Sequence, residues 1–201
     1  MKNEVSIAEM KGPLGELYDQ CSGENGRARF DEFKLWLKGV VSTLLAHVIT
    51  VRVPAIKRFV ASEVLGRTGT NRDGIRVAFL GKNFQEQFGG IVEENIPEAE
   101  LTVSRLQRQA DALEIAGAIP RERRVVKTGQ IYQLVRIHEA GGHSGLLING
   151  WGNFFLSYGV NGNLWLVLVL RSGFGWSFNA DPLGHPRRWC GDFQVFFRKC
   201  F

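Results

Sequence analysis

The stretch NFFLSYGVNGNLWLVLVL, residues 153–170, decides the fold of the C-terminal half of this chain. Two apolar runs of equal length flank the dipeptide Asn161–Gly162. An Asn-Gly pair between apolar runs predicts a β-hairpin, because a two-residue type I′ turn needs positive φ at both of its central positions. We therefore expect two antiparallel strands in a register that places Tyr158 opposite Trp165.

The second run of this hairpin predicts a strand at the centre of a sheet. One of its sides carries leucines, and the other carries Trp165 and two valines. A strand with two apolar faces is covered on both sides, so we expect Trp165 to be deeply buried. Two further apolar segments, 176–180 and 193–198, extend the hairpin into an antiparallel meander over 153–198.

The N-terminal third of the chain is predicted to be helical. From Phe30 onward, apolar residues recur at three- and four-residue steps, which is typical of a long amphipathic helix. Pro54 suits the first turn of a second helix, which would end at Gly66. We expect residues 30–65 to be helical. The polar, glycine-containing segment 67–74 is the best candidate for a boundary.

Together these patterns predict an α+β fold, in which a helical N-terminal third packs with a C-terminal antiparallel β-meander. The corresponding division is a helical region over residues 1–66 and an α+β domain over residues 75–201. The alternative, in which both parts form one compact unit, stays open because a chain of 201 residues suits a single domain.

The overall composition is that of an ordinary globular protein. Of the 201 residues, 44% are hydrophobic and 22% are charged, which excludes the collagen, coiled-coil and disordered classes. The net charge of +5 arises in residues 101–201, which carry 12 Lys and Arg against 6 Asp and Glu. A basic half can attract nucleic-acid phosphates, although short clusters of this kind are also typical of solvated turns.

The cysteines and the apolar segments indicate the compartment. Cys21, Cys190 and Cys200 stand far apart, which argues against a disulfide framework or a cysteine zinc site, and pairing of the last two stays open. The N-terminus lacks the apolar core of a signal peptide. The longest apolar stretch, residues 39–51, falls short of the roughly 20 residues that cross a bilayer. These features predict a cytoplasmic protein that does not enter a membrane.

Turn glycines and aromatic residues recur in a characteristic layout over roughly residues 76–201. The segments are Gly152-Asn153-Phe154-Phe155, Asn161-Gly162-Asn163-Leu164-Trp165, Gly175-Trp176-Ser177-Phe178-Asn179-Ala180, Trp189-Cys190-Gly191 and Val195-Phe196-Phe197, with Phe79-Leu80-Gly81-Lys82-Asn83-Phe84 and Ile96-Pro97 upstream. With these segments, this part of the chain resembles a family of small uncharacterised bacterial proteins. The resemblance implies a shared shape and brings no assigned activity.

The segment 138–143, His-Glu-Ala-Gly-Gly-His, invites comparison with a metalloprotease helix. The HExxH motif needs two histidines four residues apart on one helix face, whereas His138 and His143 are five apart with two glycines between them. Ser144 lacks the preceding strand and the final glycine of a nucleophile elbow. We therefore expect a helix end with His138 partly buried, His143 in a loop, and neither a metal ion nor an organic cofactor.

Cys190 and His185 form the least unfavourable catalytic pair. A thiol nucleophile needs a histidine within hydrogen-bond reach and an orienting carboxylate, which Asp181 or Asp192 could supply. A cysteine beside Trp189 is more typical of a small buried hydrophobic residue. The sequence thus favours a protein that is not an enzyme, with a cysteine hydrolase as the most distant alternative.

The loop between the last two strands contains the candidate binding residues. Arg187, Arg188 and Trp189 follow two prolines and a glycine that restrict the loop, and Arg and Trp are enriched at binding hot spots. Trp176, which follows a turn, could add an exposed aromatic face on which bases stack. The competing interpretation is a rigid connection whose tryptophan packs against the sheet.

Two functions of different classes are compatible with these observations. The first is a non-catalytic interaction module that binds a partner protein, since the sequence contains no metal-ligand set and no nucleotide-binding loop. The second is nucleic-acid binding through the basic C-terminal half, with Arg187, Arg188, Trp176 and Trp189 as contacts. The residues alone do not distinguish the two.

Overall fold

A computed structural model describes residues 44–199. Residues 1–43, with the helices expected there, and residues 200–201 lie outside the described part. The chain divides into two units, and the second, Leu44–Phe201, contains every described residue. The segment 67–74, which the sequence indicates as a boundary, lies within this second unit.

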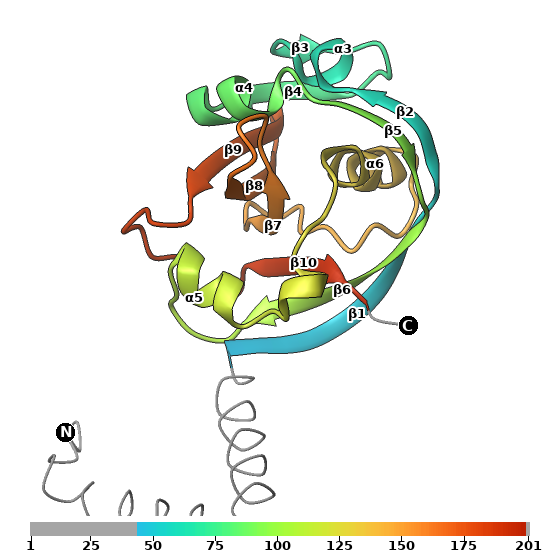
Figure 1. Ribbon diagram of the computed structural model, residues 1–201. Helices are drawn as coiled ribbons and strands as arrows, with labels where there is room; N and C mark the ends of the chain where they lie inside the picture. The colour runs from blue at the N-terminus through green and yellow to red at the C-terminus, as the bar shows by residue number, and fades with distance from the viewer. Residues whose placement is uncertain (1–43, 200–201) are drawn as a thin grey trace, which may run out of the picture. The chain divides into compact units, whose positions relative to one another are not determined.

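A strongly curved sheet of eight strands dominates this unit (Figure 1). Its strand order is β1-β6-β10-β7-β8-β9-β4-β3. The strands are β1 Leu45–Val53, β3 Gly69–Thr70, β4 Arg76–Leu80, β6 Ala99–Leu106, β7 Asn153–Tyr158, β8 Leu164–Ser172, β9 Gly175–Pro182 and β10 Gln194–Arg198. A smaller sheet pairs β2 Ile56–Val60 with β5 Val92–Ile96. The helices are α3 Ala61–Leu65, α4 Lys82–Phe88, α5 Ala112–Gly117, η2 Arg121–Arg123 and α6 Thr128–Glu139.

The small sheet continues one edge of the large one as a long antiparallel ribbon. Strands β1 and β2 follow each other along one chain segment, β5 and β6 along the other, and the pairing keeps one register from Ile49 to Val60. Pro54 and Pro97 interrupt the ladder between the two sheets, because proline has no N–H to donate. The ribbon curves around α6 (Figure 1).

The helix predicted over residues 30–65 is wrong for most of its described part. Residues 45–53 and 56–60 are strands, and of the described residues 44–65 only Ala61–Leu65 form an α-helix. The stretch is rich in β-branched residues, which suit a pleated strand, and β6 and β5 offer its two strands antiparallel partners. A dense apolar run fits either period, so this distant pairing decides the structure.

The predicted antiparallel meander is right for three strands and wrong for the fourth. Strands β7, β8 and β9 are consecutive antiparallel neighbours. Strand β10, however, does not pair with β9, whose second neighbour is β4. It lies between β6 and β7 and runs parallel to β7. The sheet is therefore mixed and the described unit is mostly β, which overturns the predicted α+β class with its helical N-terminal third.

The β7–β8 hairpin forms as predicted, but its register is shifted by one residue. Trp165 lies opposite Ser157 instead of Tyr158. Gly162 has a φ of +75°, whereas Asn161 has no positive φ, so the turn is not type I′. The loop has three residues and ends on a left-handed glycine, which is the next most common hairpin geometry. Near this end of the strand Trp165 is only partly buried, so its predicted deep burial is wrong.

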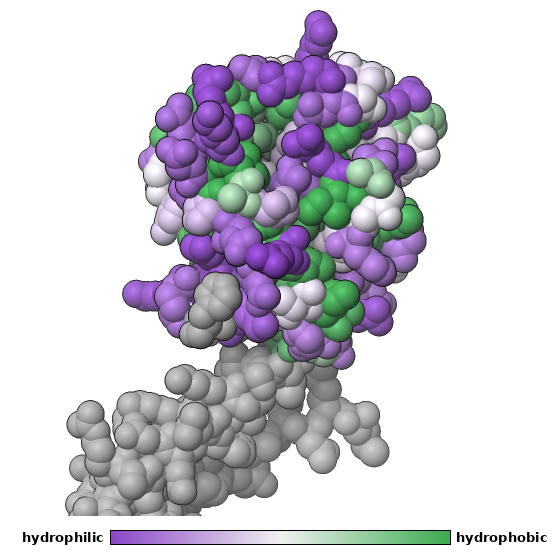
Figure 2. All heavy atoms as spheres, turned by 90° about the vertical axis from the view of Figure 1, so that its right-hand side faces the viewer, coloured by the Kyte–Doolittle hydropathy of each residue, from purple (hydrophilic) through white to green (hydrophobic). Residues whose placement is uncertain are grey.

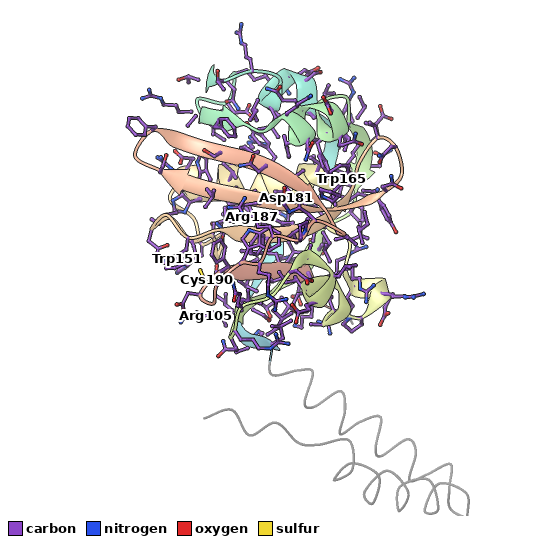
Figure 3. The ribbon with its side chains drawn as sticks, turned by 90° about the vertical axis from the view of Figure 1, so that its left-hand side faces the viewer. Arg105, Trp151, Trp165, Asp181, Arg187 and Cys190 are labelled. Carbon is purple, nitrogen blue, oxygen red and sulfur yellow. The ribbon has the colours of Figure 1, made fainter. Side chains whose placement is uncertain are left out.

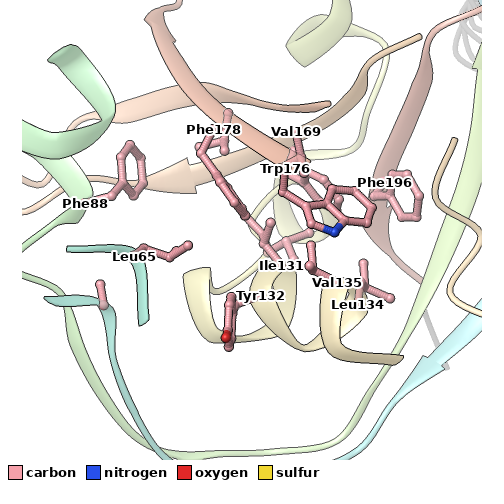
Figure 4. Packing of buried hydrophobic residues seen from close by; sticks show 14 of the residues in the cluster. Leu65, Phe88, Ile131, Tyr132, Leu134, Val135, Val169, Trp176, Phe178 and Phe196 are labelled. Atoms are coloured by element: carbon pink, nitrogen blue, oxygen red, sulfur yellow. The ribbon is translucent and has the colours of Figure 1, made fainter. Parts of the chain in front are cut away.

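Both faces of the large sheet are covered, as the two apolar faces of β8 predict. Val167 and Val169 belong to an inner cluster around α6, and Leu166 and Leu168 belong to an outer cluster with α5. Figure 4 shows the inner cluster, with side chains of α6 directed toward Trp176 and its neighbours in the sheet.

Helix α6 is fastened at its first half to the loop before β4. The hydroxyl of Tyr132 donates to Asp73 Oδ2 at 2.8 Å and accepts from Asn71 Nδ2 at the same distance. The Asn71 amide also donates to the carbonyl of Val64. Burial, reinforced by the Asp73 carboxylate, raises the pKa of Tyr132 well above its usual value. The Tyr132 hydroxyl and the Asn71 amide are thus both used within the fold.

Candidate binding pocket at the end of helix α6

Helix α6 ends in a glycine turn whose backbone N–H groups form hydrogen bonds with the last carbonyl groups of the helix. Gly141 adopts a φ of +79°, the left-handed conformation that commonly closes a helix. The N–H groups of residues 140, 141 and 142 donate to the carbonyls of Arg136, His138 and Ile137. The backbone therefore leaves the helix axis immediately after Glu139.

The next segment, residues 143–148, is fixed against the inner face of the sheet. Asn153 of β7 is fully buried and holds Leu147 at both backbone groups, with a further bond to the carbonyl of Val169. Gly145 has a φ of +72°, and a Cβ atom there would lie 3.0 Å from the side chain of Val51. The segment therefore runs close over the ribbon of β1 and β6.

Between this segment and β1 lies a cavity of about 590 Å³, which we call the α6 pocket. Its wall is mostly apolar, contains both histidines of the 138–143 segment, and has no carboxylate, lysine or arginine. The lining residues are Val48, Ile49, His138, Gly141, Gly142, His143, Ser144, Gly145, Leu146, Leu147, Ile148 and Gln194. A cavity of this size and character is typical of ligand sites.

Gln194, at the start of β10, gives the α6 pocket an unused polar group. Its side chain is 5% exposed, and no described residue donates a hydrogen bond to its Oε1 atom. Because Val195 packs in the outer cluster, Gln194 lies on the inner face of the sheet, where Arg105 of β6 is its cross-strand neighbour. A buried acceptor without a donor costs free energy, which a ligand can recover.

Trp176 forms the support behind His138. The indole is fully buried, and its Nε1–H donates to Glu139 Oε1 at 2.7 Å. The His138 ring meets the indole edge to face with ring centres 5.6 Å apart, and Arg171 forms an ion pair with Glu139. Trp176 therefore does not offer the exposed stacking surface that its place after a turn suggests, because a fully buried indole cannot stack a base from solvent.

The loop between β9 and β10, in which Figure 3 labels Arg187 and Cys190, uses most of its candidate binding residues to hold its own structure. Trp189 is 3% exposed and packs edge to face on Phe154. Arg188 forms ion pairs with Asp111 and Glu114 of the α5 capping box. Arg187 is exposed and lies over the Trp189 ring at 5.8 Å. Arg187 and Arg188 are both exposed, but of the two only Arg187 has no ion pair among the described residues.

The proposed catalytic pair is not assembled in the described structure. Cys190 is exposed, and His185 Nδ1 accepts the backbone N–H of Arg187 at 3.1 Å. Within residues 44–199, no hydrogen bond joins the two side chains. Cys200 lies outside the described residues, so the question of its pairing with Cys190 stays open.

A second hollow of about 600 Å³ lies around α3 and the loop that follows it, but three of its polar lining residues, Glu63, Asn71 and Arg72, already have partners. Glu63 pairs with Arg72 and Arg58, and Asn71 is bonded to Tyr132 and Val64. This hollow therefore lacks the unpartnered buried group that distinguishes the α6 pocket.

No family model, curated protein or solved structure matches this chain. Within residues 44–199, no three His, Cys, Asp or Glu side chains come together as they would to hold a metal ion. In the same part of the chain, no helix is both long and apolar enough to cross a membrane.

The α6 pocket was missed in the sequence because its residues come from three separate segments. His138 and His143 are in the positions expected, at a helix end and in a loop, yet the glycine turn brings both to one cavity. The Gly141–Gly142 pair was the available signal, because it forces the chain to turn back on itself. Gln194 carries no sequence signal of its own.

Proposed function

We propose that this protein is a non-catalytic interaction module that binds a partner protein through the α6 pocket. The observation that carries the proposal is the buried Gln194 acceptor, which has no donor among the described residues and lies in the wall of an apolar cavity. Binding sites for peptides and ligands combine apolar walls with a few such polar groups.

Exposed apolar side chains around the pocket support a protein partner. Val48 is 44% exposed and Ile148 is 52% exposed, and both line the cavity. Strand β1, which contributes Val48, stands at the edge of the eight-stranded sheet. An edge strand beside an apolar pocket is a common arrangement for binding an extended segment of another chain.

The test compares two exposed apolar residues that differ in their distance from the pocket. An array of random peptides is probed with the full chain, with Ile148→Asp and with Val160→Asp. Both residues are more than half exposed, so both variants should fold. We expect the peptides bound by the unaltered protein to be lost with Ile148→Asp and retained with Val160→Asp. An unchanged set of bound peptides with Ile148→Asp would overturn the proposal.

The nucleic-acid alternative is distinguished in the same experiment. A labelled single-stranded oligonucleotide is titrated with the full chain and the Ile148→Asp variant at low and moderate salt. Oligonucleotide binding that falls steeply with salt and is indifferent to Ile148→Asp, in the absence of peptide binding, would favour that alternative. The ion pairs of Arg188 and the burial of Trp176 and Trp189 favour the protein partner.

A further inference from the structure

The charge of the α6 pocket favours an anionic group on the partner. Its lining residues include no aspartate or glutamate, and two of them, His138 and His143, are imidazoles that can donate an N–H. The exposed guanidinium-bearing Arg105 is the cross-strand neighbour of Gln194, which places a positive charge on the strand beside the pocket wall. A carboxylate is the most common anionic group in proteins that suits such donors.

The backbone after α6 offers further donors. The N–H groups of residues 140–142 are occupied by the last carbonyls of the helix. By contrast, the N–H groups of His143, Ser144 and Gly145 have no hydrogen-bond partner among the described residues. Consecutive backbone donors of this kind bind carboxylates, whose two oxygens accept several hydrogen bonds.

The edge strand β1 defines how a chain would approach these donors. Residues 46–49 of β1 are exposed, and the pairing with β6 is shifted between His47 and Ile49, as at a β-bulge. The outer side of β1 has no neighbouring strand among the described residues. An extended segment can therefore lie along β1, with its end at the pocket that Val48 and Ile49 line.

We propose that the α6 pocket binds the C-terminal end of a partner chain. The terminal α-carboxylate accepts from the N–H groups of residues 143–145 and from an imidazole, and the last, apolar side chain enters between Ile49 and Ile148. An amide N–H of the same tail donates to Gln194 Oε1. This inference rests on the proposed function and specifies the chemistry of the partner.

Paired peptides test the role of the carboxylate. The probes are labelled six-residue peptides that end in Leu, Val, Ile or Phe, each made with a free C-terminal carboxylate and again as the C-terminal amide. Binding to the full chain is measured by fluorescence anisotropy. We expect at least one free-acid peptide to bind, and we expect its amide to bind about tenfold or more weakly, because charge-assisted hydrogen bonds are lost.

Matched histidine variants locate the carboxylate. We expect His143→Ala to weaken binding of the free acid while leaving binding of the amide nearly unchanged. His185→Ala, which alters an exposed histidine in the β9–β10 loop, should change neither. Circular dichroism and thermal unfolding confirm that both variants fold. Equal effects of His143→Ala on the acid and the amide would overturn the inference.

The remaining outcomes separate this inference from the proposed function. Acid and amide peptides that bind equally, with binding lost in Ile148→Asp, would leave the interaction module standing and overturn recognition of a chain end. Binding that is indifferent to Ile148→Asp would overturn both. A small apolar acid such as 4-phenylbutanoate that competes as strongly as the peptides would show that the pocket reads the carboxylate alone, and would overturn the peptide as its occupant.

Discussion

Two loops of this protein contain similar residues and use them in opposite ways. The segment after α6 and the loop between β9 and β10 each combine glycine, histidine and apolar residues. In the β9–β10 loop, Arg188 is tied to α5 and Trp189 is buried. After α6, the backbone N–H groups and the nearby Gln194 Oε1 are left without partners among the described residues. The indole Nε1–H of Trp189 also lacks a partner among the described residues, but Gln194 lines a cavity, and that combination marks the α6 pocket more clearly than residue type does.

The difference has an energetic meaning. Polar groups that are paired within the fold contribute to stability, and their loss destabilises the protein. A buried polar group without a partner lowers stability and is retained at sites where a ligand can supply the partner. Substitutions in the two loops should therefore separate stability from binding.

The largest effect is expected for Trp189→Ala. Trp189 packs in the outer cluster against Phe154, so truncation leaves a large cavity and should cost about 3–5 kcal/mol in the free energy of unfolding. Urea unfolding measures this, with Phe174→Ala as the control, since Phe174 is 76% exposed and should change stability by less than about 0.5 kcal/mol. Similar losses in the free energy of unfolding for both variants would mean that Trp189 does not anchor the β9–β10 loop to the outer cluster.

Asn153→Leu is expected to be the next most damaging change. It removes both hydrogen bonds to Leu147 and the bond to the Val169 carbonyl, which leaves buried backbone groups unpaired and should cost about 2–4 kcal/mol. Hydrogen exchange should show the Leu147 amide losing its protection. Retained protection at Leu147 would contradict the role of Asn153 in fixing the pocket wall.

Tyr132→Phe removes the hydroxyl that joins the first half of α6 to Asp73 and Asn71. It should lower the free energy of unfolding by about 1–2 kcal/mol near neutral pH. The pKa of Tyr132 is raised in the folded state, so its contribution is complete below about pH 10 and is lost as the pH rises further. The unaltered protein should thus lose stability in alkali more steeply than the variant. Urea unfolding at neutral and alkaline pH measures both slopes, and parallel slopes would contradict the prediction.

Arg188→Ala should have a smaller effect, about 0.5–1 kcal/mol, because its ion pairs with Asp111 and Glu114 are partly exposed to solvent. Arg187→Ala serves as the control and should change stability less, since no ion pair of Arg187 occurs among the described residues. Neither variant should alter binding of free-acid peptides. Loss of peptide binding in the Arg187→Ala/Arg188→Ala double variant would instead show that the peptide binds to the β9–β10 loop.

The sequence predicts those parts of the fold that depend on neighbouring residues. The β7–β8 hairpin and the two covered faces of β8 follow from local apolar runs and the Asn161–Gly162 turn. The register does not, because the choice between a two- and a three-residue loop depends on whether Asn161 adopts positive φ. The strands at 45–60 were missed because their partners, β5 and β6, lie further along the chain, from 32 residues for the pair Val60 and Val92 to 61 residues for the pair Leu45 and Leu106.

The candidate site was harder to predict than the fold. The spacing of His138 and His143 and the glycines between them predict the helix end that the structure shows, but they do not show that both histidines reach one cavity. In the β9–β10 loop, the residue types predict side chains that are exposed for binding. Only the position of α5 in the structure shows that Asp111 and Glu114 form ion pairs with Arg188 and neutralise it. Both outcomes depend on contacts between segments that are distant in sequence.

The smallest change in stability, and the most informative one, is expected for Gln194→Leu. Gln194 and Asn153 are two buried amides that lie side by side in the β10–β7 register, one without a partner at Oε1 and the other fully bonded. Replacing the unpartnered amide with an apolar side chain removes its desolvation cost, so stability should stay the same or rise by up to about 1 kcal/mol. Asn153→Leu, the matched change next to it, should lose stability as described above. Peptide binding should nevertheless weaken in Gln194→Leu, because the acceptor for the peptide amide is gone. Urea unfolding and anisotropy on the same preparations measure both quantities, and a clear loss of stability in Gln194→Leu would show that this amide serves the fold and not a ligand.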